Sequence, residues 1–163
     1  MVYLSEMPQK QRDMIVNQDL PNYKDTPCVK GPALSKRKIS IITTAGLHRR
    51  GDKVFTPGVG EYRIIPGDLD VKDLIMSHVS TNFDRTGFHQ DLNVMLPIDR
   101  LNELQAAGEI GEVAEHHYSF MGATPPMAQE AVSRDLSQVL QADGVNGVIL
   151  AGVCPQCTRA VGG

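Results

Sequence analysis

Two cysteines near the end of the 163-residue chain have the type and spacing of a reactive dithiol. Cys154 and Cys157 are separated by two residues and follow the short apolar run 148–151. A thiol reacts as its thiolate, which is favoured at a helix N-terminus, and Pro155 directly after Cys154 suits a first helical turn. We therefore expect Cys154 to act as a nucleophile, with Cys157 about one turn away to resolve a mixed disulfide.

Three other interpretations of the cysteine pair stay open. The two thiols could be half of a zinc or iron–sulfur site, two buried structural groups, or the remains of a lost site. Cys28 is the only other cysteine in the sequence, so one chain cannot supply four cysteine ligands. It lies in a stretch rich in proline and glycine, where we expect a free loop thiol. No metal site is predicted elsewhere, because the histidine spacings do not match the His-Glu-X-X-His pattern.

Two predicted strands should carry the site at their carboxyl ends. Residues 145–153 are mostly apolar and follow an Asp-Gly turn, while residues 39–44 are rich in isoleucine and threonine. In an open parallel sheet the ligand crevice lies at the carboxyl ends of the strands. Thr43 and Thr44 are therefore candidate substrate-binding residues, although threonine is equally an ordinary strand residue.

The segment from residue 47 to residue 96 is polar and irregular and contains several histidines and acidic residues. A long loop inside a compact domain is uncommon unless it has a function, so we expect this segment to cover the substrate. His78 and Asp84 are candidate substrate-binding residues that could also act as an acid–base pair. The alternative for His78 is a hydrogen-bonded structural histidine.

The remaining patterns predict an α/β fold. Helices are expected over residues 97–108 and 127–143, where apolar residues recur at helical spacing, and a further strand is expected over residues 112–118. Such an order favours an open, mainly parallel sheet flanked by helices in three layers. A dinucleotide site is not expected, because the chain lacks the Gly-X-Gly-X-X-Gly pattern.

Length and composition place the chain among ordinary globular proteins. We expect an N-terminal arm of residues 1–35, with a short helix over residues 8–16, followed by one α/β domain of residues 36–163. The net charge of −3 gives no support for nucleic acid or an anionic membrane as a partner. The N-terminus lacks a signal-peptide pattern and no apolar run is long enough to span a membrane, so a cytoplasmic location is expected, with the cysteines as thiols.

Six blocks of sequence occur in an order that resembles a known family. They are residues 40–47, residues 77–78 with 84, residues 91–93 with 96–101, residues 108–111, residues 117–122, and residues 143–145 before 154–159. Together they resemble the selenoprotein B family of glycine, sarcosine, betaine and D-proline reductases. The resemblance covers residues 34–163 and is specific because all six blocks are present in order.

This resemblance implies an oxidoreductase subunit of the type with a disulfide as acceptor, which cleaves a carbon–nitrogen bond of an amino acid or N-methylated amine. It places the family's selenocysteine on Cys154 and its next cysteine on Cys157, while Thr158 and Arg159 match the residues that follow. It also implies a hetero-oligomer with a second reductase subunit, in which a pyruvoyl group on a partner activates the substrate. No cofactor is expected on this chain itself.

Two departures from the family pattern point to its cysteine-containing members. Cys154 carries sulfur in place of selenium, which makes it a poorer nucleophile and leaving group, and Ala160 stands where some glycine reductases have a third cysteine. The alternative function is a non-catalytic subunit that binds a partner or a metal and carries a vestigial cysteine pair.

The end of the chain suggests an incomplete domain. Six residues follow Cys157, and the final Gly162-Gly163 would break a helix, so the helix and strand that usually complete a doubly wound sheet are missing. We expect either a truncated product or a second chain packed against an exposed sheet edge.

Overall fold

The computed structural model describes residues 3–20, 22, 29–80 and 84–153. Cys28, Cys154 and Cys157 lie outside the described residues, as do the predicted matches at residues 158–160. None of the helices in these ranges is long and apolar enough to cross a membrane.

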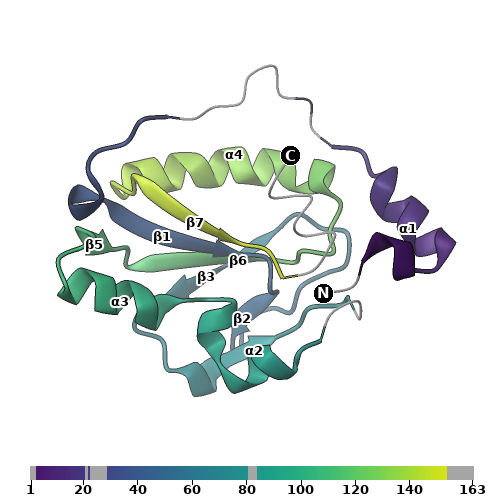
Figure 1. Ribbon diagram of the computed structural model, residues 1–163, viewed down its shortest axis with the longest axis horizontal. Helices are drawn as coiled ribbons and strands as arrows, with labels where there is room; N and C mark the ends of the chain where they lie inside the picture. Colours follow the sequence, from purple (N-terminus) through teal and green to yellow (C-terminus); the bar gives the residue numbers. More distant parts are fainter. Residues whose placement is uncertain (1–2, 21, 23–28, 81–83, 154–163) are drawn as a thin grey trace.

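The described residues form both strands and helices (Figure 1). The helices are α1 (Gln9–Val16), α2 (Thr86–Gln90), α3 (Ile98–Ala106) and α4 (Pro126–Ala142), with short 3-10 turns η1 (Leu4–Glu6), η2 (Leu34–Lys36), η3 (Val71–Asp73) and η4 (Leu92–Val94). The strands are β1 (Lys38–Thr43), β2 (Leu47–Arg49), β3 (Tyr62–Pro66), β4 (Leu74–Met76), β5 (Glu112–Val113), β6 (His116–Phe120) and β7 (Gly147–Ala151).

The main sheet is built around β1. Strand β7 pairs with it in parallel along one edge, while β5 and β6 pair with it in parallel, one after the other, along the second edge. Strand β3 then pairs with β6 in the antiparallel direction. The predicted α/β class with a mainly parallel sheet is confirmed, with one antiparallel strand added.

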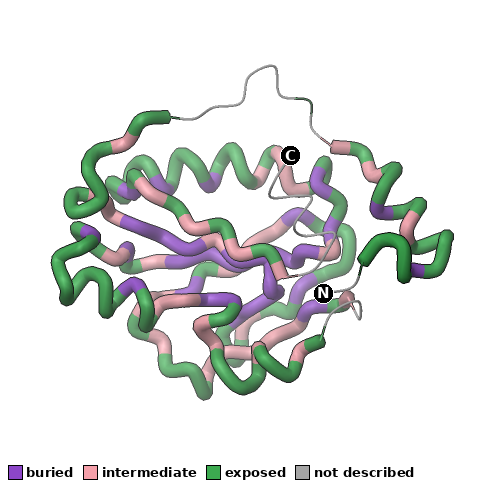
Figure 2. The backbone as a smooth tube through the Cα atoms, in the orientation of Figure 1, coloured by how far each residue is buried: buried purple, intermediate pink, exposed green. Residues whose placement is uncertain are grey.

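Helices cover the two faces of the sheet, as the predicted three-layer arrangement requires. Figure 1 shows α4 along one face and α3 along the other. Ile39 and Ile41 of β1 point into the cluster that includes Leu101 of α3, while Tyr118 of β6 packs with Leu136 of α4. Figure 2 shows the buried residues concentrated in the strands between these helices. Burying each such side chain stabilises the fold by about 1.5–3 kcal/mol.

The predicted boundaries agree closely for the long elements. The strand expected over residues 39–44 is β1, and the helices expected over residues 97–108 and 127–143 are α3 and α4. The strand expected over residues 112–118 is instead two short strands, β5 and β6, because the chain departs from regular pairing with β1 between them.

The segment from residue 47 to residue 96 differs from the expected irregular cover. It contains β3, which forms an edge of the main sheet, and the antiparallel ribbon of β2 with β4. These strands are three to five residues long. Because each strand is so short, its alternation of apolar and polar residues is hard to distinguish from the sequence of a loop.

The first helix, α1, lies in the segment expected to be an N-terminal arm. Met7 and Ile15 are buried there, while Met14 is exposed. The helix expected over residues 8–16 is present as α1. The boundary of the arm near residue 35 stays a prediction.

Candidate functional site

The carboxyl ends of β1, β6 and β7 meet at one edge of the main sheet. Thr43, the last residue of β1, is in register with Ser119 of β6 and with Ala151, the last residue of β7. Gly152 and Val153 then continue the chain toward Cys154, which lies outside the described residues. The sequence prediction that a strand ends just before the cysteine pair, at the carboxyl edge of a parallel sheet, is therefore confirmed.

The hydroxyl of Thr44 holds the backbone that leads to Cys154. Its Oγ1 donates to the carbonyl oxygen of Ala151 at 3.4 Å and accepts a hydrogen bond from the backbone N–H of Val153 at 3.2 Å. The backbone N–H of Thr44 also donates to Ala151 O at 3.0 Å. Thr44 is only 4% exposed, so this hydroxyl is a fixed part of the scaffold.

The hydroxyl of Thr43 is engaged in the same way. Its Oγ1 donates to Ala151 O at 3.4 Å and accepts from the N–H of Ala45 at 3.3 Å, and the residue is fully buried. Both threonines thus bind the backbone around the end of β7. A direct role of either threonine in substrate binding stays a prediction.

His78 lies beside the turn that ends β1. The turn residue Gly46 has φ +65°, and a Cβ added there would lie 3.1 Å from the backbone nitrogen of His78. Nδ1 of His78 accepts a hydrogen bond from the N–H of Ser80 at 3.1 Å. The Arg85 guanidinium donates to the carbonyl oxygens of His78 at 2.7 Å and Ser80 at 2.5 Å.

Burial determines the charge state of His78. The side chain is 3% exposed, and desolvation, assisted by the positive charge of Arg85, lowers the pKa of His78 to about 4. The imidazole is therefore neutral at pH 7, and the lowered pKa makes it a weak base.

Asp84 has a different local role. Its exposed carboxylate accepts a hydrogen bond from the N–H of Thr86 at 2.9 Å, at the start of α2, and these bonds to Thr86 lower the pKa of Asp84. The described hydrogen bonds of Asp84 are with Thr86, and the expected pairing of Asp84 with His78 stays a prediction.

The structure adds a histidine–serine pair that the sequence did not single out. Nδ1 of His48 lies 3.0 Å from the carbonyl oxygen of Arg49 and Nε2 lies 2.7 Å from Oγ of Ser77. A carbonyl oxygen only accepts, so Nδ1 carries the proton, and in the neutral ring Nε2 accepts from the Ser77 hydroxyl. A hydroxyl that donates to an oriented imidazole is an arrangement suited to proton transfer.

This pair lies at the same edge as His78. The backbone N–H of Ser77 donates to Gly46 O at 2.9 Å, and β2 and β4 bring His48 and Ser77 together across their antiparallel ribbon. The two residues are 29 positions apart, so no local pattern connects them. The signals available in the sequence were a histidine just after the first strand and a serine in one of the six blocks.

His117 is a buried structural histidine. Its Nδ1 accepts from the N–H of Ile41 at 3.1 Å, and burial lowers the pKa of His117 to about 4. Its neighbour His116 is half-buried, as expected for adjacent strand residues that face opposite sides of a sheet.

No three His, Cys, Asp or Glu side chains within residues 3–20, 22, 29–80 and 84–153 converge in a way that could hold a metal ion. The cysteine pair itself lies outside those residues. Metal binding by that pair therefore stays open as an alternative.

The chain is similar to subunits of amino-acid reductases. Residues 10–153 match the family described as glycine/sarcosine/betaine reductase selenoprotein B. The D-proline reductase subunit gamma of Acetoanaerobium sticklandii is 31% identical over 138 residues, which cover 83% of this chain and 55% of that protein. The glycine reductase complex component B subunit gamma of Carboxydothermus hydrogenoformans is 30% identical over 166 residues, which cover 96% of this chain and 35% of that protein.

The betaine reductase complex component B subunit beta of Peptoclostridium acidaminophilum is 29% identical over 135 residues, which cover 77% of this chain and 30% of that protein. The chain thus spans about half the length of the first of these relatives and about a third of the other two. No solved structure matches it at a significant level. The family match ends at Val153, directly before Cys154.

Proposed function

The chain belongs to the glycine/sarcosine/betaine reductase selenoprotein B family, and from this membership we propose that it is a thiol-dependent reductase subunit. Its substrate class is an amino acid or N-methylated amine whose carbon–nitrogen bond is cleaved reductively. Support comes from relatives named as subunits of D-proline, glycine, betaine and sarcosine reductases.

In the proposed reaction the dithiol supplies two electrons. The Cys154 thiolate attacks the carbon, so that a C–S bond forms as the carbon–nitrogen bond breaks and the nitrogen takes up a proton and leaves as the amine. The C–S bond breaks when Cys157 attacks the sulfur of Cys154, and the carbon then takes up a proton. Cys157 then closes a disulfide with Cys154, so the two thiol hydrogens balance the two bonds formed to hydrogen. A dithiol of a partner protein returns the pair to the reduced state.

The observation that most supports this proposal is the hydrogen bonding of Thr44. Its hydroxyl and N–H together make three hydrogen bonds to Ala151 and Val153, the residues that lead to Cys154. A nucleophile reacts faster when the backbone beside it is held in one geometry before the reaction. The loss of conformational entropy then occurs on folding and adds nothing to the reaction barrier.

Proton handling is assigned to the histidines at the same edge. The leaving nitrogen needs a proton, and the thiol of Cys154 must lose one. Ser77 is half-buried and donates a hydrogen bond to His48, so this pair can take up a proton and pass one on, whereas the lowered pKa of His78 makes it a weak base.

The proposed enzyme works as part of a complex. Relatives are named as components or subunits of reductase complexes, and this chain spans only part of their length. In this proposal a pyruvoyl group belongs to a partner subunit and would supply an electron-withdrawing carbonyl that activates the amine.

The test is the pH dependence of Cys154 alkylation, followed by mass spectrometry of the whole chain, with Cys28 as the internal reference. We expect Cys154 to react with an apparent pKa well below the roughly 8.5 of an ordinary thiol, and Cys28 to react near that value. Equal titration of the two thiols, or full activity of the complex after Cys154 is alkylated, would refute the proposal.

A second candidate is a non-catalytic subunit that binds a partner, with the cysteines vestigial or ligating a metal. It is favoured by β7, an edge strand of the main sheet on which Val148 is 42% and Leu150 is 52% exposed. Stoichiometric zinc or iron that is lost in a Cys154→Ser/Cys157→Ser variant would support this candidate over the reductase.

A further inference from the structure

A phenylalanine packs against the imidazole of the His48–Ser77 pair. Phe55, in the loop between β2 and β3, is 6% exposed, and its ring centroid lies 6.3 Å from that of His48 with the two planes at 72°. This is the edge-to-face arrangement that aromatic rings prefer. Both ring nitrogens of His48 already contact oxygen atoms, those of Arg49 O and Ser77 Oγ. The imidazole is therefore held at both nitrogens and by an aromatic neighbour.

Arg63 holds this phenylalanine in place. Its guanidinium carbon lies 4.6 Å from the centroid of the Phe55 ring, within the range of a cation–π contact. Its Nε donates to Lys53 O at 2.8 Å, and its Nη2 donates to Val54 O at 3.2 Å. These carbonyls belong to the two residues directly before Phe55. Arg63 thus fixes both the ring and the backbone that carries it.

Arg63 is itself fixed to the main sheet. It belongs to β3, which pairs with β6, and its side chain is only 11% exposed. Nη1 donates to Tyr62 O at 3.0 Å, and Nη2 donates to the Glu61 carboxylate at 2.9 Å. A lysine cannot make this set of bonds, because they need the planar fork of the guanidinium. A continuous series of contacts therefore connects β3, through Arg63 and Phe55, to His48.

This support matters because of the tautomer that His48 adopts. Arg49 O only accepts, so Nδ1 carries the proton and Nε2 is left to accept from Ser77. In water an isolated histidine side chain favours the opposite tautomer, with the proton on Nε2. In that form Nε2 could not take a proton from the serine. A ring that was free to turn would therefore lose the form that proton transfer needs.

The position of Ser77 gives the path of the proton. The imidazole is 2% exposed, whereas Ser77 is half-buried, so among the described residues Ser77 is the side chain through which a proton reaches the ring. When a proton arrives, the hydroxyl hydrogen passes to Nε2 and the serine oxygen keeps the arriving proton. The serine stays neutral, and the imidazole becomes a cation whose Nδ1–H still donates to Arg49 O.

We propose that Phe55 and Arg63 are positioning residues, which hold His48 in the tautomer that can accept the Ser77 proton. This inference rests on the proposed function, in which the His48–Ser77 pair handles protons for the reaction at Cys154. Phe55 and Arg63 act through His48 alone and make no contact with the substrate.

The test is ¹⁵N NMR of the imidazole nitrogens of the whole chain at pH 8, with the His48 signals assigned from a His48→Gln variant. The unchanged chain should show the proton on Nδ1. Phe55→Leu should raise the ratio of the Nε2–H form to the Nδ1–H form by about two- to tenfold, the equivalent of the 0.5–1.5 kcal/mol of an aromatic pair. Phe120→Leu removes an equally buried ring, which packs against Tyr62, and should leave the ratio unchanged.

A second pair of variants tests Arg63. Arg63→Lys keeps the charge and the Phe55 ring but loses the fork, so it should shift the tautomer ratio in the same direction as Phe55→Leu. It reports on the proposal even where Phe55→Leu fails to fold. Arg100→Lys is the matched control, because the Arg100 side chain is 60% exposed on α3 and pairs with Glu103 at 2.8 Å. This change should leave the ratio as it is.

An unchanged ratio in Arg63→Lys and in folded Phe55→Leu would overturn the proposal. So would an equal shift in Phe120→Leu or Arg100→Lys, because a general loss of rigidity would then account for it. The tautomer ratio does not depend on Cys154. Equal titration of Cys154 and Cys28 would therefore refute the reductase proposal and leave the tautomer result standing, so the two can fail separately.

Discussion

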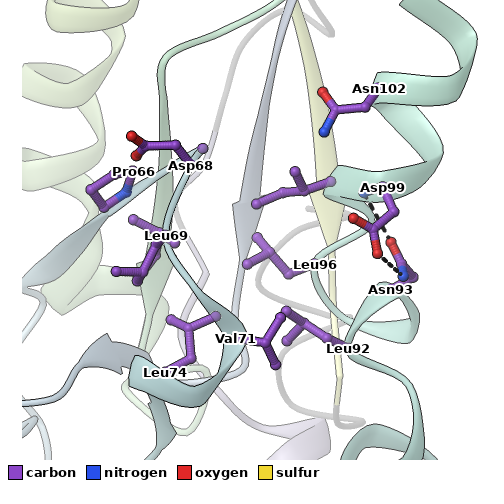
Figure 3. Close-up of a pocket in the computed structure, with 13 residues that line it drawn as sticks. Pro66, Asp68, Leu69, Val71, Leu74, Leu92, Asn93, Leu96, Asp99 and Asn102 are labelled. Atoms are coloured by element: carbon purple, nitrogen blue, oxygen red, sulfur yellow. Dashed lines mark hydrogen bonds between the residues drawn. The ribbon is translucent and has the colours of Figure 1, made fainter.

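The polar side chains at the carboxyl edge of the main sheet are buried and hydrogen-bonded, whereas those at the cavity between β3 and α3 are exposed. At the edge, Thr43, Thr44 and His78 are almost fully buried, and their polar atoms are hydrogen-bonded to the backbone. At the cavity of about 130 Å³ that residues 65–74 and 92–102 line, Asp68 and Asp99 are exposed (Figure 3). Buried, satisfied groups fix a geometry, whereas exposed charges beside a cavity are free to meet a ligand.

The largest expected effect comes from titrating the buried histidines. The pKa of His78 and that of His117 are lowered to about 4 by burial, so the unfolded chain binds more protons than the folded chain between about pH 4 and 6.5. Stability should therefore rise with pH in this window. We expect each histidine to cost about 2 kcal/mol of unfolding free energy when the pH falls from 7 to 5.

Urea unfolding at pH 5, 6 and 7 measures this loss. Asp70, Asp84 and Asp91 have pKa values lowered below the ordinary 3.8, so their stabilisation is lost only at lower pH and does not enter this range. An unfolding free energy that does not change between pH 5 and 7 would contradict the contrast. It would mean that His78 at the carboxyl edge is as open to water as the carboxylates at the cavity rim.

The turn at Gly46 gives the next largest effect. Gly46→Ala places a Cβ at φ +65°, 3.1 Å from the backbone nitrogen of His78 and from Cε of Met121, and should cost about 2–3 kcal/mol. Gly108→Ala is the matched control, because Gly108 has φ +72° with no atom within 4 Å of the added Cβ. It should cost only the backbone strain of about 1 kcal/mol.

Denaturant midpoints of the two variants give the difference directly. If both glycine variants lose the same stability, the crowding at the carboxyl edge is too soft to hold His78 in place.

The smallest expected effect is at Thr44. Thr44→Val keeps the shape of the side chain but removes the oxygen that accepts the Val153 N–H, which should cost about 1 kcal/mol of stability. It should also bring the alkylation rate of Cys154 closer to that of Cys28. Thr44→Ser retains the hydroxyl and should retain the Cys154 rate.

The measurement is the alkylation rate of Cys154 at pH 7 in the unchanged chain, in Thr44→Val and in Thr44→Ser. An unchanged Cys154 rate in Thr44→Val, with stability lowered, would assign Thr44 a purely structural role and weaken the contrast between the two regions.

Much of the scaffold could be predicted from local patterns. The β-branched run of β1 and the helical spacing of α4 were each long enough for their periods to be read, and the placement of β7 before the cysteines followed from a short apolar run after a turn. Strands β2, β3 and β4 were missed, because three to five residues in a polar segment give almost no period.

The candidate site was only partly accessible to this reasoning. The type and spacing of Cys154 and Cys157 suggested thiol chemistry, and the ordered blocks suggested the family, which the match over residues 10–153 confirms. The partners of the polar groups were not accessible, because a hydroxyl or an imidazole bonds to whatever the fold brings near it.

The sequence by itself therefore determined the α/β class, the long elements, the family and the position of the dithiol after a strand, since each depends on residue type and local spacing. Tertiary structure decided that Thr44 bonds to Ala151 and Val153, that Ser77 bonds to His48, and that acidic residues from two distant segments surround one cavity. These contacts depend on strand register and on packing between segments far apart in the chain, which no local pattern encodes.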